Sequence, residues 1–115
     1  MDFVKMEGLG NDFVVIAGPL RPAAADVAAW CDRRLGIGAD GVLVVTPLEP
    51  AAVRMEYWNA DGSPAEMCGN GLRCTARFAV DEGMVAGPEF TVATPVGERS
   101  VMVRPDGTDM LGSRI

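Results

Sequence analysis

The segment MCGNGLRC, residues 67–74, places a thiol directly before a Gly-Asn-Gly turn and the start of a helical pattern. From Leu72 onward, apolar residues recur at positions i, i+4, i+7 and i+8, which is the spacing of an amphipathic helix with one buried face. Gly83 comes just after this pattern and is a typical stop signal. The sequence therefore predicts a helix that begins near Asn70 and ends near Gly83.

Cys68 falls beside the N-terminus of this predicted helix. The first N–H groups of a helix have no intrahelical partner, and the helix dipole adds positive potential there. This setting lowers a thiol pKa from about 8.5 toward roughly 3.5–7.5, which makes the thiol a base or nucleophile at neutral pH. The same helix start suits a carboxylate or phosphate ligand. Cysteine is also among the most buried residue types, so the pattern alone leaves a core role open for Cys68 beside the catalytic one.

The other two cysteines are predicted to be structural. Cys74 lies inside the predicted helix, one turn before Phe78, and Cys31 shares an apolar stripe with Val27 and Leu35. Three cysteines without framework spacing fit a reducing cytoplasm. The chain has no histidine, which excludes Cys–His and Ser–His–Asp catalysis within it and disfavours a zinc site.

Length and charge restrict the functional classes. At 115 residues the chain is one small domain or part of a larger one. Its formal charge of −6 argues against a nucleic-acid partner, because such partners are bound through clustered basic residues. Neither an apolar run long enough to cross a bilayer nor a cleavable leader pattern is present, so we expect no membrane association and a cytoplasmic location.

Short apolar runs bounded by Gly, Pro and Asn predict a series of strands. Residues 3–7 and 13–17 are expected to form a hairpin, and the pattern favours a plain turn role for Asn11 between them. Further strands are expected at residues 42–46, 53–59, 66–67, 90–94, 100–104 and 110–111.

A first helix is expected between the second and third strands. Asp26 is its predicted N-cap, and the helix should run to Leu35 and end at Gly36. Strands joined by short turns, with only two helices, predict an α+β fold with a mostly antiparallel sheet.

Four motifs, taken in this order, closely resemble those of the diaminopimelate epimerase family. They are KMEGLGNDF at residues 5–13, CDR and GIGAD within residues 31–40, NADGS at residues 59–63 and MCGNG at residues 67–71. Members of the family have two similar α+β halves around a cleft, and each half brings one catalytic cysteine to the N-terminus of a central helix. The resemblance implies that residues 1–115 are the N-terminal epimerase domain, without the second domain and without the terminal strand that returns to complete this half.

The resemblance implies a cofactor-independent isomerase that inverts one α-carbon between LL- and meso-diaminopimelate, in the synthesis of lysine and peptidoglycan precursors. Inversion needs a base on one face of the α-carbon and an acid on the other. Charge that develops on the α-carboxylate needs strong stabilisation, and one lost hydrogen-bond donor to such a charge costs about 2.7–4 kcal/mol. Two helix N-termini supply this field, so the resemblance implies neither pyridoxal phosphate nor a metal.

Site residues follow from the matching motifs. By this resemblance Cys68 is one thiol of the acid/base pair, and the backbone amides of Gly69 and Asn70 bind the reacting carboxylate. Asn11 and Asn59 are implied to hydrogen-bond the amino-acid groups of the substrate, which replaces the turn role that the pattern alone gave Asn11.

The chain departs from the family pattern at Glu7, where the family often has His, and at Gly41, where it often has a Gln that contacts the substrate. The second catalytic cysteine belongs to the missing C-terminal half, so we expect the chain alone to be inactive and to associate, for example as a homodimer, through its uncovered edge. The alternative hypothesis is a truncated homologue that holds small carboxylates at the helix start without catalysis.

Overall fold

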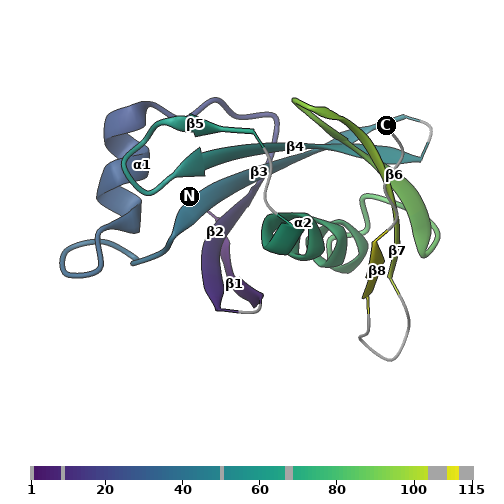
Figure 1. Ribbon diagram of the computed structural model, residues 1–115, viewed down its shortest axis with the longest axis horizontal. Helices are drawn as coiled ribbons and strands as arrows, with labels where there is room; N and C mark the ends of the chain where they lie inside the picture. Colours follow the sequence, from purple (N-terminus) through teal and green to yellow (C-terminus); the bar gives the residue numbers. More distant parts are fainter. Residues whose placement is uncertain (1, 9, 50, 67–68, 104–108, 112–115) are drawn as a thin grey trace.

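One curled sheet wraps around helix α2 (Gly69–Asp81) in the computed structural model (Figure 1). The structure describes residues 2–8, 10–49, 51–66, 69–103 and 109–111. The other elements are helix α1 (Ala24–Cys31) and strands β1 (Val4–Gly8), β2 (Asn11–Ala17), β3 (Gly41–Leu48), β4 (Ala52–Asn59), β5 (Pro64–Ala65), β6 (Glu89–Thr94), β7 (Gly97–Val103) and β8 (Asp109–Leu111). The sheet order is β1-β2-β3-β4-β6-β7-β8, and β5 pairs separately with the end of β4.

The predicted α+β class and mostly antiparallel sheet are confirmed. In the described part of the chain, five of the seven strand pairs are antiparallel, whereas β2–β3 and β4–β6 are parallel. A parallel pair needs a long crossover connection. Helix α1 lies in the crossover from β2 to β3, and α2 lies in the crossover from β4 to β6.

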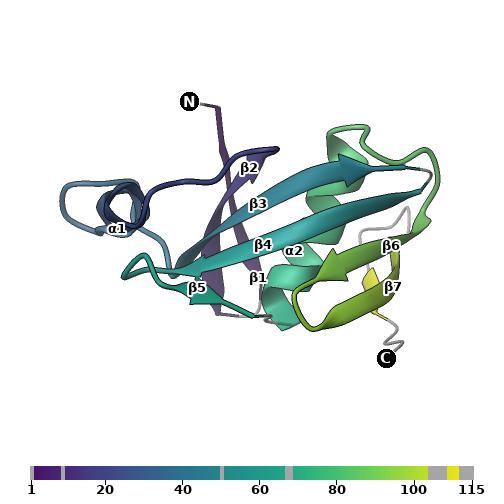
Figure 2. The same ribbon diagram turned by 90° about the horizontal axis from the view of Figure 1, so that it is seen from above.

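The central strands are buried on both faces. Phe13 and Val15 belong to the apolar cluster around α2, whereas Val14 and Ile16 belong to the cluster that contains residues of α1. Successive side chains of a strand point to opposite faces, so β2 contributes to both clusters. This two-sided burial explains why the sequence shows a continuous apolar run here instead of an alternating one. In Figure 2, β3 and β4 pass over α2, and α1 lies toward the other end of the sheet.

The first helix differs from the prediction of Asp26 to Leu35. Helix α1 begins at Ala24, three residues before the start implied by an N-cap at Asp26, and ends at Cys31 without a side-chain N-cap. The carboxylate of Asp32 accepts the backbone N–H groups of Arg34 and Leu35, at 2.8 and 3.1 Å, and so bends the chain into a turn. Leu35 is consequently 93% exposed and does not continue the apolar stripe.

The second helix agrees with the prediction. It begins at Gly69 and ends at Asp81. Gly83 has φ +70°, and its N–H donates to the carbonyl of Val80 at 3.1 Å, as expected of a glycine that terminates a helix. Buried side chains of α2 include Leu72, Cys74, Thr75, Ala76, Phe78 and Ala79.

The hairpin at the N-terminus is also confirmed, but its ladder is longer than predicted. Glu7 pairs with Asp12 and Gly8 pairs with Asn11, so Asn11 is the first residue of β2 and not part of the connecting turn. The short strand predicted at residues 66–67 lies earlier, at β5, and Met67 is outside the described residues.

Candidate functional site

Two of the site residues expected from the motifs, Asn11 and Asn59, lie at the side of the sheet where β2 and β3 begin and β4 ends. Phe13 pairs with Gly41, and Gly41 pairs with Asn59, so these three residues form one row across the sheet. Asn11 precedes Phe13 by two residues on the same strand and therefore shares its face. The parallel pairing of β2 with β3 brings together segments about 28 residues apart in the chain.

Three side chains, hydrogen-bonded in series and called here the Asn70–Asn11–Asp40 chain, connect this end of the strands to the first turn of α2. The Nδ2 of Asn70 donates to the Oδ1 of Asn11 at 2.7 Å, and the Nδ2 of Asn11 donates to the Oδ2 of Asp40 at 3.2 Å. Asn70 is the second residue of α2, so Asn11 joins the sheet to the helix start. A β-carbon built on Gly8 would lie 3.5 Å from the backbone oxygen of Asn70, so the hairpin approaches α2 closely here.

Asp40 belongs to a cluster of four charged side chains, the others being Asp12, Arg33 and Lys5. Arg33 holds Asp12 through two hydrogen bonds of 2.8 and 3.1 Å and also donates to the Oδ1 of Asp40 at 3.1 Å. Lys5 approaches Asp12 at 3.3 Å. The hydrogen bond from Arg33 is the main reason that the pKa of Asp12 lies well below its usual range. Burial opposes this effect, and the contact with Lys5 lowers the pKa further. The same contact with Asp12 raises the pKa of Arg33.

Asn59 lies at the same sheet edge but bonds within its own turn. Its Nδ2 donates to the Oγ of Ser63 at 3.1 Å, and its N–H donates to the Ser63 carbonyl at 2.8 Å. The hydroxyl and the N–H of Ser63 both donate to Asp61, which lowers the pKa of that carboxyl. Gly62 closes the turn with φ +91°. The NADGS motif therefore fixes Asn59 locally, apart from the Asn70–Asn11–Asp40 chain.

The start of α2 is open. Gly69 is exposed, and a β-carbon built on it would meet no atom within 4 Å. The first turn carries no acidic residue, so its N–H groups and the helix dipole present positive potential that favours an anion. Cys68, which precedes Gly69 in the sequence, lies outside the described residues.

Gly41 has no room for a side chain. A β-carbon built on it would lie 2.5 Å from Cε1 of Tyr57 and 2.6 Å from the carbonyl oxygen of Trp58. The ring of Tyr57 packs edge-on against Phe13, with centroids 5.7 Å apart. The ring of Tyr57 therefore lies where a side chain at position 41 would begin.

Three residues near the site were not given a role by the sequence. Asp40 and Arg33 lie inside a motif that was used only for the resemblance, and Tyr57 lies in a strand that pattern alone assigned to the sheet. Their contacts join segments distant in sequence, so the only available signal was the motif itself.

The two described cysteines are buried, as predicted. Cys31 and Cys74 are each 4% exposed. Burial raises the pKa of the Cys31 thiol, although the charge of Arg33 opposes this effect. Within the described residues no cluster of three or more His, Cys, Asp and Glu could hold a metal ion, and no described helix is long and apolar enough to cross a membrane.

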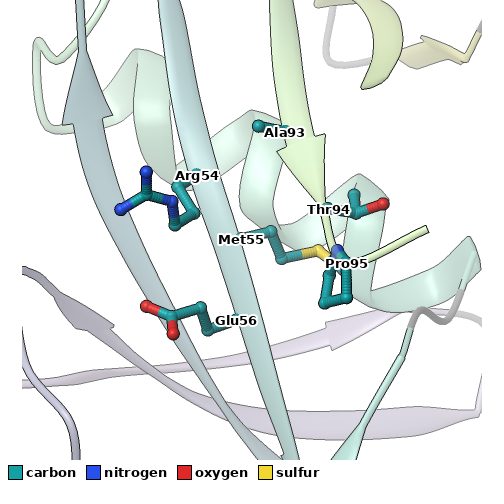
Figure 3. Close-up of a pocket in the computed structure, with 6 residues that line it drawn as sticks. All are labelled: Arg54, Met55, Glu56, Ala93, Thr94 and Pro95. Atoms are coloured by element: carbon teal, nitrogen blue, oxygen red, sulfur yellow. The ribbon is translucent and has the colours of Figure 1, made fainter. Parts of the chain in front are cut away.

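Two cavities lie away from this edge of the sheet. One, of about 180 Å³, is lined by Arg54, Met55, Glu56, Ala93, Thr94 and Pro95. Figure 3 shows Met55 reaching toward Thr94 and Pro95, while Arg54 and Glu56 project to the other side of β4. A second, of about 440 Å³, shares Arg54 and Glu56 and extends to Pro19, Leu20, Arg21 and Thr46. Arg54 is five residues from Asn59, or roughly 16 Å along the strand. Neither cavity includes a site residue expected from the motifs.

Comparison with known sequences identifies a family. The sequence profile of diaminopimelate epimerase matches residues 3–114. The chain is 47% identical over 124 residues to the diaminopimelate epimerase of Thermobifida fusca, an alignment that covers 93% of this chain and 45% of that protein. It is 50% identical over 98 residues to the diaminopimelate epimerase of Caldanaerobacter subterraneus, covering 84% of this chain and 36% of that protein. The chain thus spans less than half the length of these curated relatives.

Comparison with solved structures gives the same type of fold. A methylitaconate-delta-isomerase matches with a TM-score of 0.68 at 18% identity, covering 93% of this chain and 61% of that one. A hydroxyproline epimerase from Agrobacterium vitis, solved with bound trans-4-hydroxy-L-proline, matches with a TM-score of 0.66 at 14% identity, covering 91% and 38%. At these identities the likeness concerns the fold alone.

Proposed function

Because the chain belongs to the diaminopimelate epimerase family, we propose that it contributes the N-terminal half of an active site that interconverts LL- and meso-diaminopimelate. The observation that carries this proposal is the hydrogen bond between Asn11 and Asn70, which sets two carboxamides at the open start of a 13-residue helix. Asn59 lies at the same edge of the sheet. Polar groups that hold an α-amino acid are thereby concentrated where an anion is favoured.

The helix start is the proposed site for the reacting carboxylate. The backbone N–H groups of Gly69 and Asn70 would donate to it, and the first turn carries no acidic side chain that would compete with it. Negative charge grows on this carboxylate as the α-proton leaves, so donors aimed at it stabilise the transition state more than the ground state. Asn11 and Asn59 would orient the amino-acid group through their amides.

The charge balance of the surrounding residues supports a carboxylate ligand. The carboxylates of Asp12 and Asp40 face the cations of Arg33 and Lys5, two charges of each sign, so the cluster adds little net repulsion. Arg33 binds Asp12 at 2.8 Å and Asp40 at 3.1 Å, so both carboxylates already have a cationic partner within the cluster. A ligand carboxylate at α2 would therefore be held mainly by the helix start.

Cys68 is the proposed acid/base group of this half. By sequence it immediately precedes the first residue of α2, where a thiol pKa would be lowered. One thiol can serve only one face of the α-carbon, so a second must come from a second half of the protein. We therefore propose that residues 1–115 alone do not epimerise diaminopimelate, that the missing C-terminal half is their functional partner, and that the enzyme acts without a cofactor in the cytoplasm.

The test is exchange of the α-proton in deuterated water. Chain 1–115, mixed with the separately produced C-terminal part of the Thermobifida fusca relative, should epimerise LL-diaminopimelate, whereas either piece alone should not. Cys68→Ala should abolish the recovered activity, and Cys31→Ala, which removes a buried thiol, should retain it. Sustained epimerisation by residues 1–115 alone would contradict the two-thiol mechanism. Binding of diaminopimelate without exchange in any mixture would favour the carboxylate-binding module instead.

A further inference from the structure

We propose that Asp40 is a positioning residue that fixes the orientation of the Asn11 carboxamide and, through it, that of Asn70 at the start of α2. The assignment of a ligand to these two carboxamides rests on the proposed function. The positioning itself rests on contacts that join the connection before β3, strand β2 and helix α2, over sequence separations of 29 and 59 residues.

The direction of the hydrogen bonds carries the argument. An ionised carboxylate only accepts hydrogen bonds, so the Asn11 side chain must turn its NH₂ group toward Asp40. Its oxygen then faces α2, where it accepts the NH₂ group of Asn70 at 2.7 Å. If the Asn11 carboxamide were reversed, two NH₂ groups would face each other and an oxygen would face the carboxylate. Asp40 therefore selects one of two orientations.

Asp40 is itself held firmly. Its N–H donates to the backbone oxygen and to the Oδ1 of Asp12 at 2.9 and 3.0 Å, while its Oδ2 accepts the N–H of Asp12 at 3.1 Å. Arg33 binds the remaining oxygen at 3.1 Å. These reciprocal contacts prevent the carboxylate from following Asn11 if the latter rotates. A fixed acceptor is what a positioning role requires.

The orientation determines which groups a ligand meets. Each carboxamide has a second N–H, and Asn70 keeps its oxygen for a partner other than Asn11. Both N–H groups suit the carboxylate of an α-amino acid, and the oxygen of Asn70 suits its ammonium group. If the Asn11 carboxamide rotated, the Asn70 carboxamide would lose its acceptor and turn, and its N–H and oxygen would no longer face the carboxylate and ammonium groups of the ligand.

The matched pair for the experiment is Asp40→Ala and Asp32→Ala. Both remove one carboxylate from the connection between α1 and β3, and both remove acceptors of backbone N–H groups. The Asp32 carboxylate, however, accepts the N–H groups of Arg34 and Leu35 and not that of Asp12. The readout is hydrogen exchange of the side-chain NH₂ groups of Asn11 and Asn70, followed by nuclear magnetic resonance without any ligand. We expect Asp40→Ala to speed exchange at both by roughly three- to tenfold, the factor that corresponds to one lost hydrogen bond.

The control results decide between positioning and general loosening. Asp32→Ala should leave both signals unchanged, and Asp40→Asn, which keeps an oxygen for Asn11, should restore most of the protection. An unchanged Asn70 signal in folded Asp40→Ala, or an equal effect of Asp32→Ala, would overturn the proposal. If Asp40→Ala does not fold, Asn11→Ala replaces it, since it spares the contacts of Asp40 with Asp12 and Arg33. Asn11→Ala should then speed hydrogen exchange of the Asn70 side-chain NH₂ group, and an unchanged exchange rate would again overturn the proposal.

A second measurement separates this inference from the proposed function. Titration with meso-diaminopimelate should show weaker binding to Asp40→Ala by a factor of three or more, and Asp40→Ala should add no further loss in an Asn11→Ala background. If Asp40→Ala weakened binding of meso-diaminopimelate equally in the unmodified chain and in the Asn11→Ala variant, Asp40 would not act through Asn11. If the unmodified chain, alone and with the C-terminal part, binds no diaminopimelate, the proposed function fails, whereas the exchange experiment still judges the role of Asp40.

Discussion

Gly41 and Tyr57 compete for one space, because a β-carbon on Gly41 would lie 2.5 Å from Cε1 of the Tyr57 ring. The backbone oxygen of Trp58, at 2.6 Å from the same point, closes the other side. Gly41 lies between Phe13 and Asn59 in the row of residues that leads to the candidate site. The absence of a side chain at position 41 is therefore a requirement of packing in this chain. The ring of Tyr57, two residues before Asn59 on β4, occupies this space instead.

Gly41→Ala should destabilise the protein. The added methyl group meets a backbone oxygen that cannot rotate away, and overpacking of this kind costs about 1–3 kcal/mol. Urea denaturation should show this loss in the free energy of unfolding. Gly87→Ala is the control, because a β-carbon at Gly87 meets no atom within 4 Å. Equal stability of the two variants would show that the backbone at Gly41 relaxes easily.

Loss of the Arg33 guanidinium should change how stability depends on pH. Arg33 lowers the pKa of Asp12 in the folded protein, so Asp12 contributes stability above its unfolded pKa of about 3.9, and this contribution is lost as pH falls toward the lower folded value. Arg33→Gln should therefore be less stable than the unmodified protein at pH 7. The difference between the two should shrink as pH falls below about 4.

Urea denaturation between pH 7 and pH 2 measures this difference. Arg34→Gln is the matched control, since the contacts of Asp12 involve Arg33 and not its neighbour. The prediction is wrong if the difference between Arg33→Gln and the unmodified protein stays constant over this range, or if Arg34→Gln shows the same dependence.

Patterns within a short stretch of sequence predicted the structural features that depend on neighbouring residues, such as helix ends and hairpins. The start of α2 follows from its apolar spacing, its end follows from Gly83, and the first hairpin follows from its glycines. Helix α1 was predicted to be too long. The Asp32 carboxylate accepts the N–H groups of Arg34 and Leu35, which replaces their hydrogen bonds within a helix, and the spacing of apolar residues carries no signal for such a side-chain contact.

Contacts over long sequence separations could not be predicted in the same way. The parallel pairing of β2 with β3 brings Asp40 next to Asn11, and neither residue carries a local signal for the other. The motifs named Asn11, Asn59 and Asn70 as site residues through the resemblance to a family. They did not predict that Asn11 and Asn70 bond to each other while Asn59 bonds to Ser63.

The chain should associate in solution. The sheet ends at β1 on one side, where Val4 is 42% exposed, and such strand edges pair readily with other strands. Light scattering should give an average mass above the 12.1 kDa of one chain. Val4→Lys should lower that mass, because a charged edge resists pairing, whereas Val96→Lys, at a similarly exposed turn, should not. A monomer at high concentration without dye-accessible apolar surface would contradict this expectation.

The last prediction concerns which thiol reacts. Cys31 and Cys74 are each 4% exposed, and burial raises the pKa of Cys31, so neither should present a reactive thiolate at neutral pH. Cys68, by its sequence position before α2, should be alkylated first by a limiting amount of iodoacetamide, with a rate that rises through an apparent pKa below that of an ordinary thiol. Sulfate should slow this reaction more than chloride at equal ionic strength, because an oxyanion would occupy the N–H groups of the helix start. Peptide mapping identifies the modified residue, and urea should add labelling of the two buried cysteines. Modification of Cys31 or Cys74 before Cys68 in the folded protein would show that the helix start does not activate the thiol.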